Sequence, residues 1–370
     1  MKKSWIQYVR GKTNRQARVG GVGKMHEELF GRQGFAGPAA MLYHEKPAGE
    51  LIRIEGNLGV QSLRADKFDA ADMNDPGADF TVLVSNADIQ VGLSQRKSDM
   101  PFAFRNTDGD LLYFVHKGEG VFATEFGPIA YEPGDYVLLP KGTTFRLMPT
   151  TDDGVFYVTQ SVQPIGLSEH EQVGRHVPFD PTLITVPDIV PYDWPDQEEW
   201  EVRIKHSGEY SSAFYPTNPM DLIGWKGDLF PFKINIRDII PISSDRIHLA
   251  PSSWATFETD KMMIVTFLPQ VSVADMTSEE LSSIHRNIDS DETIFIHDHP
   301  AIGGGIFSHV PQGLVHGPPK AIRDMFNNSI RKPGDRRMLT AVSVDSYAPL
   351  KPSAELVEFQ KNNPEAGIGL

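Results

Sequence analysis

The stretch HRNIDSDETIFIH, residues 285–297, has a near-copy in FRNTDGDLLYFVH, residues 104–116. Aligned without a gap, the two segments share six of thirteen positions: an Arg, an Asn, two Asp, a Phe and the final His. Where they differ, the later copy has His285 and Glu292 in place of bulky apolar groups. The chain therefore contains one structural unit twice, and the two copies differ in polar residues that suit a functional site.

The repeat continues downstream with identical spacing. GIFSHVPQGLVH at 305–316 and GDYVLLPKGTTF at 134–145 each run Gly, five residues, Pro, one residue, Gly, two residues and a last residue. That last residue is a His in the later copy and a Phe in the earlier one. Three polar residues of the later copy are thus replaced together by apolar ones, namely His285 by Phe104, Glu292 by Leu111 and His316 by Phe145.

Short β-rich segments divided by turn residues make up most of the sequence. The chain has 32 Gly and 28 Pro spread along its length, as in the segment 120–142. This rhythm is typical of antiparallel sandwiches and barrels rather than of alternating βα units. Helical signals are few: Thr277 and Glu280 form a capping-box pattern within 277–286, and 353–362 is a second candidate. We expect an all-β fold with few short helices.

Composition and charge exclude several classes of function. The net charge of −14 argues against a nucleic-acid binder, and the lack of Cys excludes disulfides, thiolate metal sites and Cys nucleophiles. The early lysines of residues 1–12 are not followed by an apolar core, so they do not form a secretory signal. Apolar runs such as 262–268 are too short to cross a bilayer. We expect a cytoplasmic protein with neither nucleic acid nor a membrane as its partner.

The Gly-x5-Pro-x-Gly-x2-His spacing resembles the second conserved motif of the cupins, a family of double-stranded β-barrels. The resemblance implies that His316 points into a barrel. Because alternate side chains of a barrel strand face the interior, His285, Glu292 and His316 are predicted to meet there. Two imidazoles and a carboxylate with open positions form the facial triad of non-haem Fe(II) oxygenases, and burying them without a metal is unfavourable. We expect the later barrel to bind Fe(II) and the earlier one to fill the same space with apolar side chains.

Asp291 and Glu292 are adjacent, and the repeat separates their roles. Asp291 is retained as Asp110 in the copy without the histidines, so it is predicted to serve the fold, for example in a turn. Glu292 disappears together with the histidines and is the predicted metal ligand. By the same reasoning His297, retained as His116, is predicted to be an ordinary core histidine.

We expect two tandem cupin-type double-stranded β-barrel (jelly-roll) domains. The Pro-rich and acidic stretch 180–204 is predicted to lie between them. The expected division is an N-terminal arm at 1–50, a degenerate metal-free barrel at 51–165, a linker at 166–205, a catalytic metal-binding barrel at 206–345 and a C-terminal tail at 346–370. The arm is expected to pack on the body or on a neighbouring subunit.

Several blocks of the chain resemble homogentisate 1,2-dioxygenases, and they occur in that family's order. The first half contributes FRNTDGDLLYFVHKGEGVFATEFG at 104–127. The second half contributes IGWKGDLFPFKINIRDI at 223–239, IHLAPSSWATF at 247–257, VADMTSEELSSIHRN at 273–287 and HVPQGLVHGP at 309–318. The resemblance covers roughly residues 25–345.

This resemblance implies roles for individual residues. The family's iron ligands correspond to His285, the following carboxylate and His316. His248 falls where the family has an active-site base near the substrate hydroxyl, and His309 falls where it places another His near the substrate. The near-neutral pKa of an imidazole suits proton transfer from a phenol at physiological pH.

The sequence departs from the family at two places. The family has one residue fewer between the first ligand His and the carboxylate, which favours Asp291, whereas the internal repeat favours Glu292. The segment TIFIHDHPAIGG at 293–304 does not reproduce the family's longer, Tyr-containing segment that lines the substrate pocket. These departures bear more on the substrate than on the chemistry.

The resemblance implies an Fe(II)- and O2-dependent dioxygenase that cleaves the ring of a 2,5-dihydroxyphenyl compound in aromatic catabolism. Homogentisate, an intermediate of tyrosine degradation, is the first expected substrate, followed by gentisate or a substituted hydroquinone. A metal-dependent cupin isomerase and a non-catalytic ligand-binding bicupin are the alternatives from other classes. Iron is favoured over manganese by the ligand set and the resemblance. The N-terminal arm and exposed barrel edges suggest a homo-oligomer.

Overall fold

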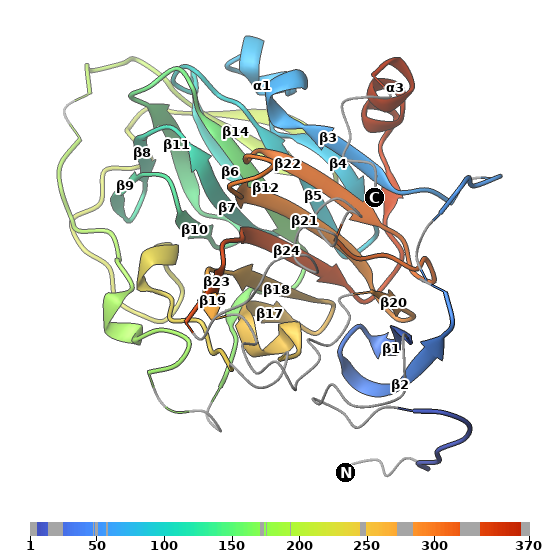
Figure 1. Cartoon of the computed structure of the whole chain (residues 1–370). Helices are drawn as coiled ribbons and strands as arrows, with labels where there is room; N and C mark the ends of the chain where they lie inside the picture. Colours follow the sequence, from blue (N-terminus) through green and yellow to red (C-terminus); the bar gives the residue numbers. More distant parts are fainter. Residues whose placement is uncertain are drawn as a thin grey trace.

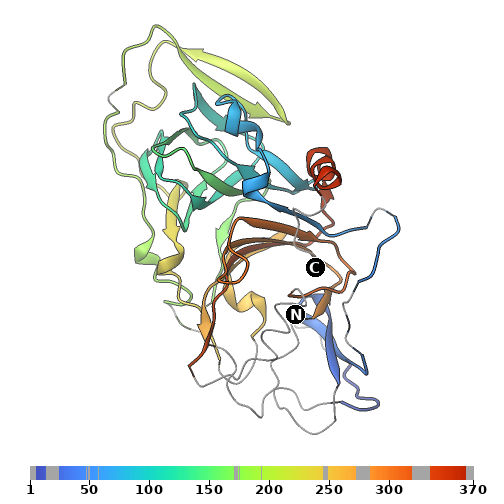
Figure 2. The same ribbon diagram turned by 45° about the horizontal axis from the view of Figure 1, so that its top comes forward.

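The computed structural model describes residues 6–13, 25–46, 48, 51–56, 58–170, 174, 176–192, 194–244, 249–271, 284–318 and 334–363. Within these residues nearly all regular structure is β, arranged as two barrels that pack against each other (Figure 1). In Figure 2 the earlier barrel, coloured blue to green, lies above the later barrel in orange and red. None of the helices in the described part has the length and apolar character that a membrane crossing requires.

Two sheets build the earlier barrel. The seven-stranded sheet has the order β16 (Phe232–Asn235), β10 (Asp135–Leu139), β7 (Asp110–Lys117), β12 (Val155–Ser161), β5 (Ile89–Ser94), β4 (Thr81–Ser85), β25 (Lys351–Pro352). The six-stranded sheet has the order β15 (Glu209–Tyr215), β14 (Trp200–His206), β6 (Ala103–Asn106), β11 (Thr144–Pro149), β8 (Gly120–Thr124), β9 (Gly127–Tyr131). Aromatic and aliphatic side chains fill the space between these sheets.

The later barrel is built around a second seven-stranded sheet. Its order is β13 (Gly166–Leu167), β17 (Ala255–Thr259), β18 (Met262–Phe267), β24 (Thr340–Ser346), β21 (Asp291–Asp298), β22 (Ile306–Val310), β3 (Gln61–Arg64). Opposite it lie a three-stranded sheet and a short pair, which comprise β2 (Ala36–His44), β1 (His26–Gln33), β20 (His285–Asn287), β19 (Gln270–Val271) and β23 (Arg336–Arg337).

A buried layer joins the seven-stranded sheets of the two barrels. Tyr157 on β12 stacks on Phe295 on β21, with ring centroids 5.1 Å apart. Its hydroxyl lies 2.7 Å from Thr293 Oγ1. His116 and His297, which are equivalent in the repeat, meet in this layer with their Nδ1 atoms 2.9 Å apart. Removing this apolar surface from water stabilises the association of the barrels.

The sequence repeat is also a structural repeat. In the earlier barrel the Gly142 amide donates to the Asn106 carbonyl at 2.8 Å, and in the later barrel the Gly313 amide donates to the Asn287 carbonyl at 2.8 Å. Gly142 and Gly313 have φ of +86° and +80°, a conformation that favours glycine over other residues. The predicted Pro-x-Gly turn is therefore present in both barrels, and in each it forms a backbone hydrogen bond with the equivalent strand, β6 in the earlier barrel and β20 in the later one.

The strand pairing does not follow the expected boundaries at 51–165, 166–205 and 206–345. β3 pairs with β22 of the later barrel, whereas β14, β15 and β16 lie in sheets of the earlier one. β25 in the expected tail pairs with β4, and β1 in the expected arm pairs with β20. This exchange gives edge strands of each barrel a partner from a distant part of the chain, which protects their free hydrogen-bonding groups.

Helices are short in the described residues. They comprise α1 (Ala71–Asn74), α3 (Ala354–Asn362) and 3-10 turns at Ala65–Lys67, Pro181–Leu183, Ile236–Asp238 and Pro251–Trp254. The α3 helix occupies the predicted stretch 353–362, and Ser353 caps it by accepting a hydrogen bond from the Leu356 amide at 3.2 Å. The expected helical turn at 277–286 falls mainly on residues 272–283, which lie outside the described residues.

Candidate metal centre

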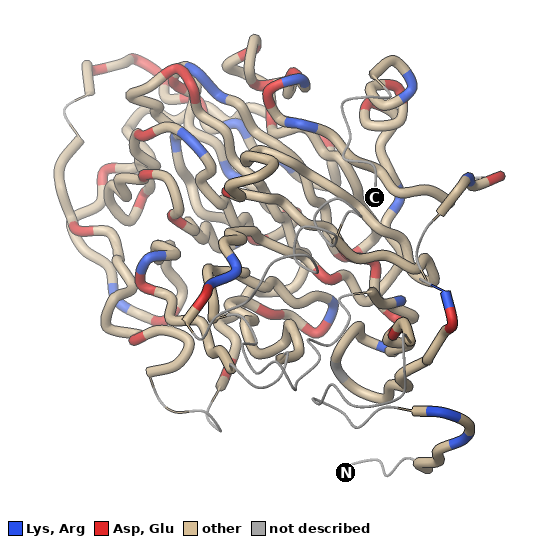
Figure 3. Tube along the Cα trace, in the orientation of Figure 1, with Lys and Arg blue, Asp and Glu red and all other residues tan. Residues whose placement is uncertain are grey.

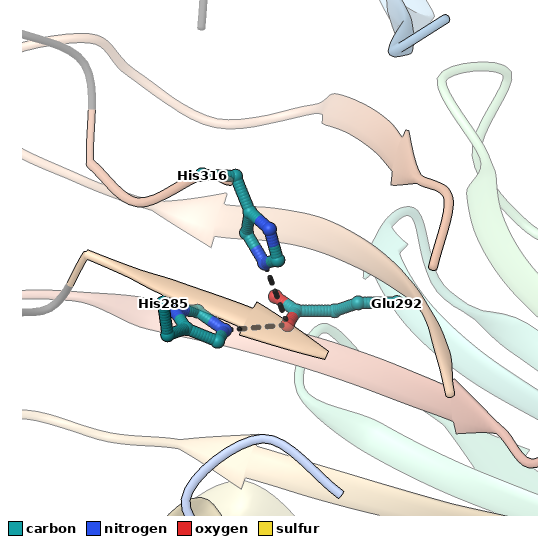
Figure 4. Close-up of side chains that lie close together, drawn as sticks. All are labelled: His285, Glu292 and His316. Carbon is teal, nitrogen blue, oxygen red and sulfur yellow. Dashed lines mark hydrogen bonds and ion pairs between the residues drawn. The ribbon is translucent and has the colours of Figure 1, made fainter. Parts of the chain in front are cut away.

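His285, Glu292 and His316 converge in the later barrel (Figure 4). One ligand atom from each lies within 4.8 Å of the others. Glu292 Oε2 is 3.5 Å from His285 Nε2 and 3.4 Å from His316 Nε2. The backbones of His285 and His316 also pair with each other, and the amide of each histidine donates to the carbonyl oxygen of the other at 2.9 Å. Backbone pairing therefore holds the two imidazoles side by side on one wall.

Strand alternation explains why Glu292 reaches this point. On β21, Glu292 and Ile294 line a cavity inside the later barrel, whereas Thr293 and Phe295 point the other way and contact Tyr157. A shift of one residue along this strand would exchange the two faces. The carboxylate at 292, and not its neighbour at 291, consequently faces the histidines.

Hydrogen bonding decides which nitrogen of His316 faces the carboxylate. His316 Nδ1 lies 2.8 Å from the Leu314 carbonyl oxygen. Because a carbonyl only accepts, Nδ1 carries a proton and Nε2 is the atom left to bind a cation. This arrangement matches the way in which metal-binding histidines are usually oriented.

The electrostatics of the cluster favour a cation between its members. Burial opposes ionisation of Glu292, but hydrogen bonds from His285 and His316 outweigh it and hold the pKa of this carboxyl well below its usual range. Burial lowers the pKa of His316, while the Glu292 carboxylate raises it by more. Glu292 is therefore a charged carboxylate whose histidine neighbours supply the compensating donors, a role that a divalent metal would take over.

Asp345 is a further carboxyl group at this site, which sequence reasoning missed. It is the cross-strand neighbour of Glu292 on β24 and lines the same cavity. Ser343 Oγ donates to its Oδ1 at 2.9 Å. Burial, together with the negative charge of Glu292, raises the pKa of Asp345 to about 8. In the earlier barrel Gln160 takes the equivalent place beside Leu111, and extending the repeat to these strands would have shown the difference.

The cavity beside the cluster has a volume of about 240 Å³. Much of its wall is apolar and includes Phe35, Trp254, Phe267, Leu268, Ile294 and Val310. The polar side chains that line it include Gln270, His299, Ser308, Arg337 and Ser343. Pockets of this kind, with apolar walls and a few polar groups, hold small organic ligands.

In the earlier barrel, apolar side chains fill the space that corresponds to the metal cluster. Phe104 and Phe145 stand where the later barrel has its histidines, and their ring centroids are 5.6 Å apart in an edge-to-face contact. Both are buried with Leu111 in one apolar cluster. The later barrel has exchanged these three core residues for polar ones beside a cavity.

Comparison with known proteins agrees with these features. A family model described as homogentisate 1,2-dioxygenase N-terminal matches residues 82–236. A protein of Saccharolobus solfataricus, provisionally named a dioxygenase, is 27% identical over 349 residues, which cover 89% of each chain. The homogentisate 1,2-dioxygenase of Rhodopseudomonas palustris is 27% identical over 62% of this chain and 54% of its own length. The chain is thus similar to the homogentisate dioxygenase superfamily.

A second homogentisate dioxygenase and one solved structure are also similar to this chain. The homogentisate 1,2-dioxygenase of Rhizobium rhizogenes is 28% identical over 73% of this chain and 63% of its own length. The chain thus spans less than two thirds of the two homogentisate dioxygenases named here. A cupin barrel protein from Leptotrichia buccalis covers 80% of this chain and 92% of its own, with 8% identity and a TM-score of 0.32.

Asp291, the carboxylate favoured by the spacing in homogentisate dioxygenases, is engaged elsewhere in this protein. Its Oδ1 accepts from the Gln312 amide at 3.0 Å and its Oδ2 from the Leu350 amide at 2.8 Å. Oδ2 also lies 2.9 Å from His309 Nε2. Both oxygens are therefore occupied by the fold, and the structure brings Glu292 rather than Asp291 to the histidines.

The two other expected site residues have different outcomes. His309 is 1% exposed and paired with Asp291, and it alternates on β22 with Ser308 and Val310, which line the cavity. The structure therefore does not bring His309 together with the metal cluster, because strand alternation turns it away from the cavity. His248, the expected active-site base, lies outside the described residues.

Proposed function

We propose that this protein is an Fe(II)- and O2-dependent dioxygenase that opens the ring of a 2,5-dihydroxyphenyl compound. The observation that carries the proposal is the convergence of His285, Glu292 and His316 on one wall of an apolar cavity. The names of its relatives support the same reaction class.

The donor set fits a first-row divalent metal. Two imidazole nitrogens and one carboxylate oxygen on one side leave the remaining coordination positions open, as in the facial triad of non-haem iron oxygenases. When bound, Fe(II) supplies the coupling of dioxygen to an electron-rich ring, which no side chain can supply. Both atoms of O2 enter the ring-opened product, so the overall reaction requires no external reductant.

The side chains around the metal position prepare the substrate. Apolar walls, including Phe35 and Trp254, exclude water and hold an aromatic ring next to the ligands. Holding both reactants in one small space removes much of the entropic barrier to their encounter. The Asp345 carboxyl lines the same cavity beside Glu292 and can exchange a proton with a phenolic oxygen.

Homogentisate is the first candidate substrate because relatives of this chain are named homogentisate 1,2-dioxygenase. Gentisate and substituted hydroquinones are the next candidates, because they share the 2,5-dihydroxyphenyl ring and because the pocket segment at 293–304 differs from the family's. His248 remains the proposed base for the phenolic proton.

Oxygen uptake by protein loaded anaerobically with Fe(II) tests the proposal. Homogentisate, gentisate and simple hydroquinones are offered in turn, with wild type, Glu292→Ala and Asp291→Ala compared. The expected result is stoichiometric uptake with one compound, lost in Glu292→Ala and kept in folded Asp291→Ala. Turnover without oxygen uptake would indicate a cupin isomerase instead, and ligand binding without bound metal or turnover would indicate a binding protein.

A homo-oligomer is also part of the proposal. β15 is an edge strand of its sheet, and Tyr210 and Phe214 on it are 49% and 58% exposed. In Figure 3 basic and acidic residues are interspersed along the described part of the tube, whereas a nucleic-acid interface would gather basic residues on one face. Sedimentation of wild type at several concentrations measures the state, and a monomer at all of them would contradict it.

A further inference from the structure

The N-terminal hairpin is anchored to the strand that carries His285. β1 runs parallel to β20, with Leu29 opposite His285 and Gly31 opposite Asn287. The Leu29 amide donates to the Ile284 carbonyl at 3.0 Å, and two amides beyond β20 donate to carbonyls of β1. The hairpin lies against the later barrel beside β20 (Figure 2). Its position relative to the candidate ligands is thus set by backbone hydrogen bonds.

The turn of this hairpin reaches the cluster itself. Gly34 has a φ of +55°, and a Cβ at this position would lie 2.9 Å from Asn287 Oδ1. The next residue, Phe35, has its ring centroid 4.7 Å from that of His285, with the planes tilted by 46°. Phe35 is half-buried and forms part of the cavity wall. An aromatic side chain from the N-terminal region therefore covers one candidate ligand.

The earlier barrel has an equivalent hairpin, which also places an aromatic residue near the position that corresponds to His285. Its hairpin of β14 and β15 also runs parallel to the equivalent strand β6, with Arg203 opposite Phe104. Tyr210 of that hairpin approaches Phe104, with ring centroids 6.4 Å apart. There the aromatic residue covers a packed core, whereas Phe35 covers a cavity. Tyr210 therefore provides a matched control for Phe35.

We infer that Phe35 determines which aromatic ligands the cavity accepts, by limiting the substituent that a dihydroxyphenyl ring can carry on the side of His285. The inference rests on the proposed function and adds a selectivity residue to it. A hydrophobic wall discriminates between ligands by size. A ligand substituent that fits gains apolar contact with the Phe35 side chain, whereas a larger substituent clashes with the Phe35 ring. Because Phe35 acts through shape, its replacement should change the choice between ligands more than the ring-cleaving step.

Calorimetric titration of anaerobic Zn(II)-loaded protein measures this choice without consuming the ligand. The probes are methylhydroquinone and phenylhydroquinone, and the readout is the ratio of their dissociation constants. Phe35→Ala should shift this ratio in favour of phenylhydroquinone by about tenfold, the scale of a misfit in an apolar pocket. Phe35→Trp should shift it the opposite way, and Tyr210→Ala should leave it unchanged.

An unchanged ratio in both Phe35 variants would overturn the inference, as would an equal shift in Tyr210→Ala or a wild type that binds neither probe. Far-UV circular dichroism and the urea midpoint establish that each variant is folded, and Phe35→Leu replaces Phe35→Ala if the latter is not. Oxygen uptake by the Fe(II)-loaded wild type separates the two proposals. Binding that follows the predicted ratios without any oxygen uptake would refute ring cleavage and leave the role of Phe35 standing.

Discussion

Asp110 and Asp291 make the same pair of backbone contacts in the two barrels. Asp110 accepts from the Lys141 amide at 2.7 Å and the Ile165 amide at 2.8 Å. Asp291 accepts from the amides of Gln312 at 3.0 Å and Leu350 at 2.8 Å. The aspartate retained in both copies therefore ties a turn and a following segment to the start of β7 or β21.

The first prediction separates this structural carboxylate from its neighbour. Asp291→Ala leaves two amides without their acceptor, so the free energy of unfolding should fall by about 3 kcal/mol or more. Metal binding by the folded variant should persist, because Glu292 is unchanged. Urea unfolding and Co(II) titration measure the two quantities, with Asp110→Ala as the matched variant in the earlier barrel. Loss of Co(II) binding in folded Asp291→Ala would contradict this assignment.

The second prediction concerns Glu292 as a ligand. Glu292→Gln keeps the shape of the side chain but removes its charge, so the affinity for Co(II) or Fe(II) should fall by at least about a hundredfold, beyond the effect of changing an outer-shell partner. The absorption bands of Co(II) report the binding. Glu258→Gln, at an exposed position on β17, is the control and should bind as wild type does. Equal affinity in both variants would exclude Glu292 from the metal site.

The third prediction is a pH dependence of metal binding. Asp345 has its pKa raised to about 8 by burial and by Glu292, and the pKa of His316 is also raised because Glu292 outweighs burial. Both groups hold protons that a cation must displace, so affinity for Co(II) should increase as the pH rises to about 8. Asp345→Asn removes one of these protons, and its affinity should depend less steeply on pH. Identical slopes in the two proteins would argue against Asp345 as a coupled group.

The fourth prediction is a loss of stability in acid. Burial, with smaller contributions from His297 and Lys117, lowers the pKa of His116 to about 3, and burial lowers that of His297. Below about pH 6.5 the unfolded chain binds protons that the folded chain excludes. The contribution of these neutral histidines to the free energy of unfolding should therefore be fully present above that pH and should be lost towards pH 3. From His116 alone, the free energy of unfolding should fall by about 2 kcal/mol between pH 6.5 and pH 5.

Urea unfolding of wild type and of the double variant His116→Asn, His297→Asn across this pH range checks the fourth prediction. The double variant loses a buried contact and should be less stable at neutral pH, but its stability should change less on acidification. A variant that loses stability in acid as steeply as wild type would show that other groups are responsible. Lys117 and Asp298 are the neighbouring charged groups in this region.

Local pattern was sufficient for the all-β class, for the repeat and for the grouping of His285, Glu292 and His316. These follow from turn residues at fixed spacing and from the period of two along a strand, which are properties of neighbouring residues. The comparison of two copies in one chain also separated Glu292 from Asp291. The pairing of His309 with Asp291 was not foreseen, because spacing places a residue on a strand, while register decides which face it occupies.

The sequence by itself determined that the chain contains two related barrels and that only the later one has its apolar trio replaced by two histidines and a carboxylate. Only the tertiary structure decided that Phe35 covers His285, that Asp345 stands beside Glu292, and that strands are exchanged between the halves. The physical reason is that these contacts join residues far apart in the sequence. They depend on which edge strands pair and in which register, and no local propensity or periodicity encodes that choice.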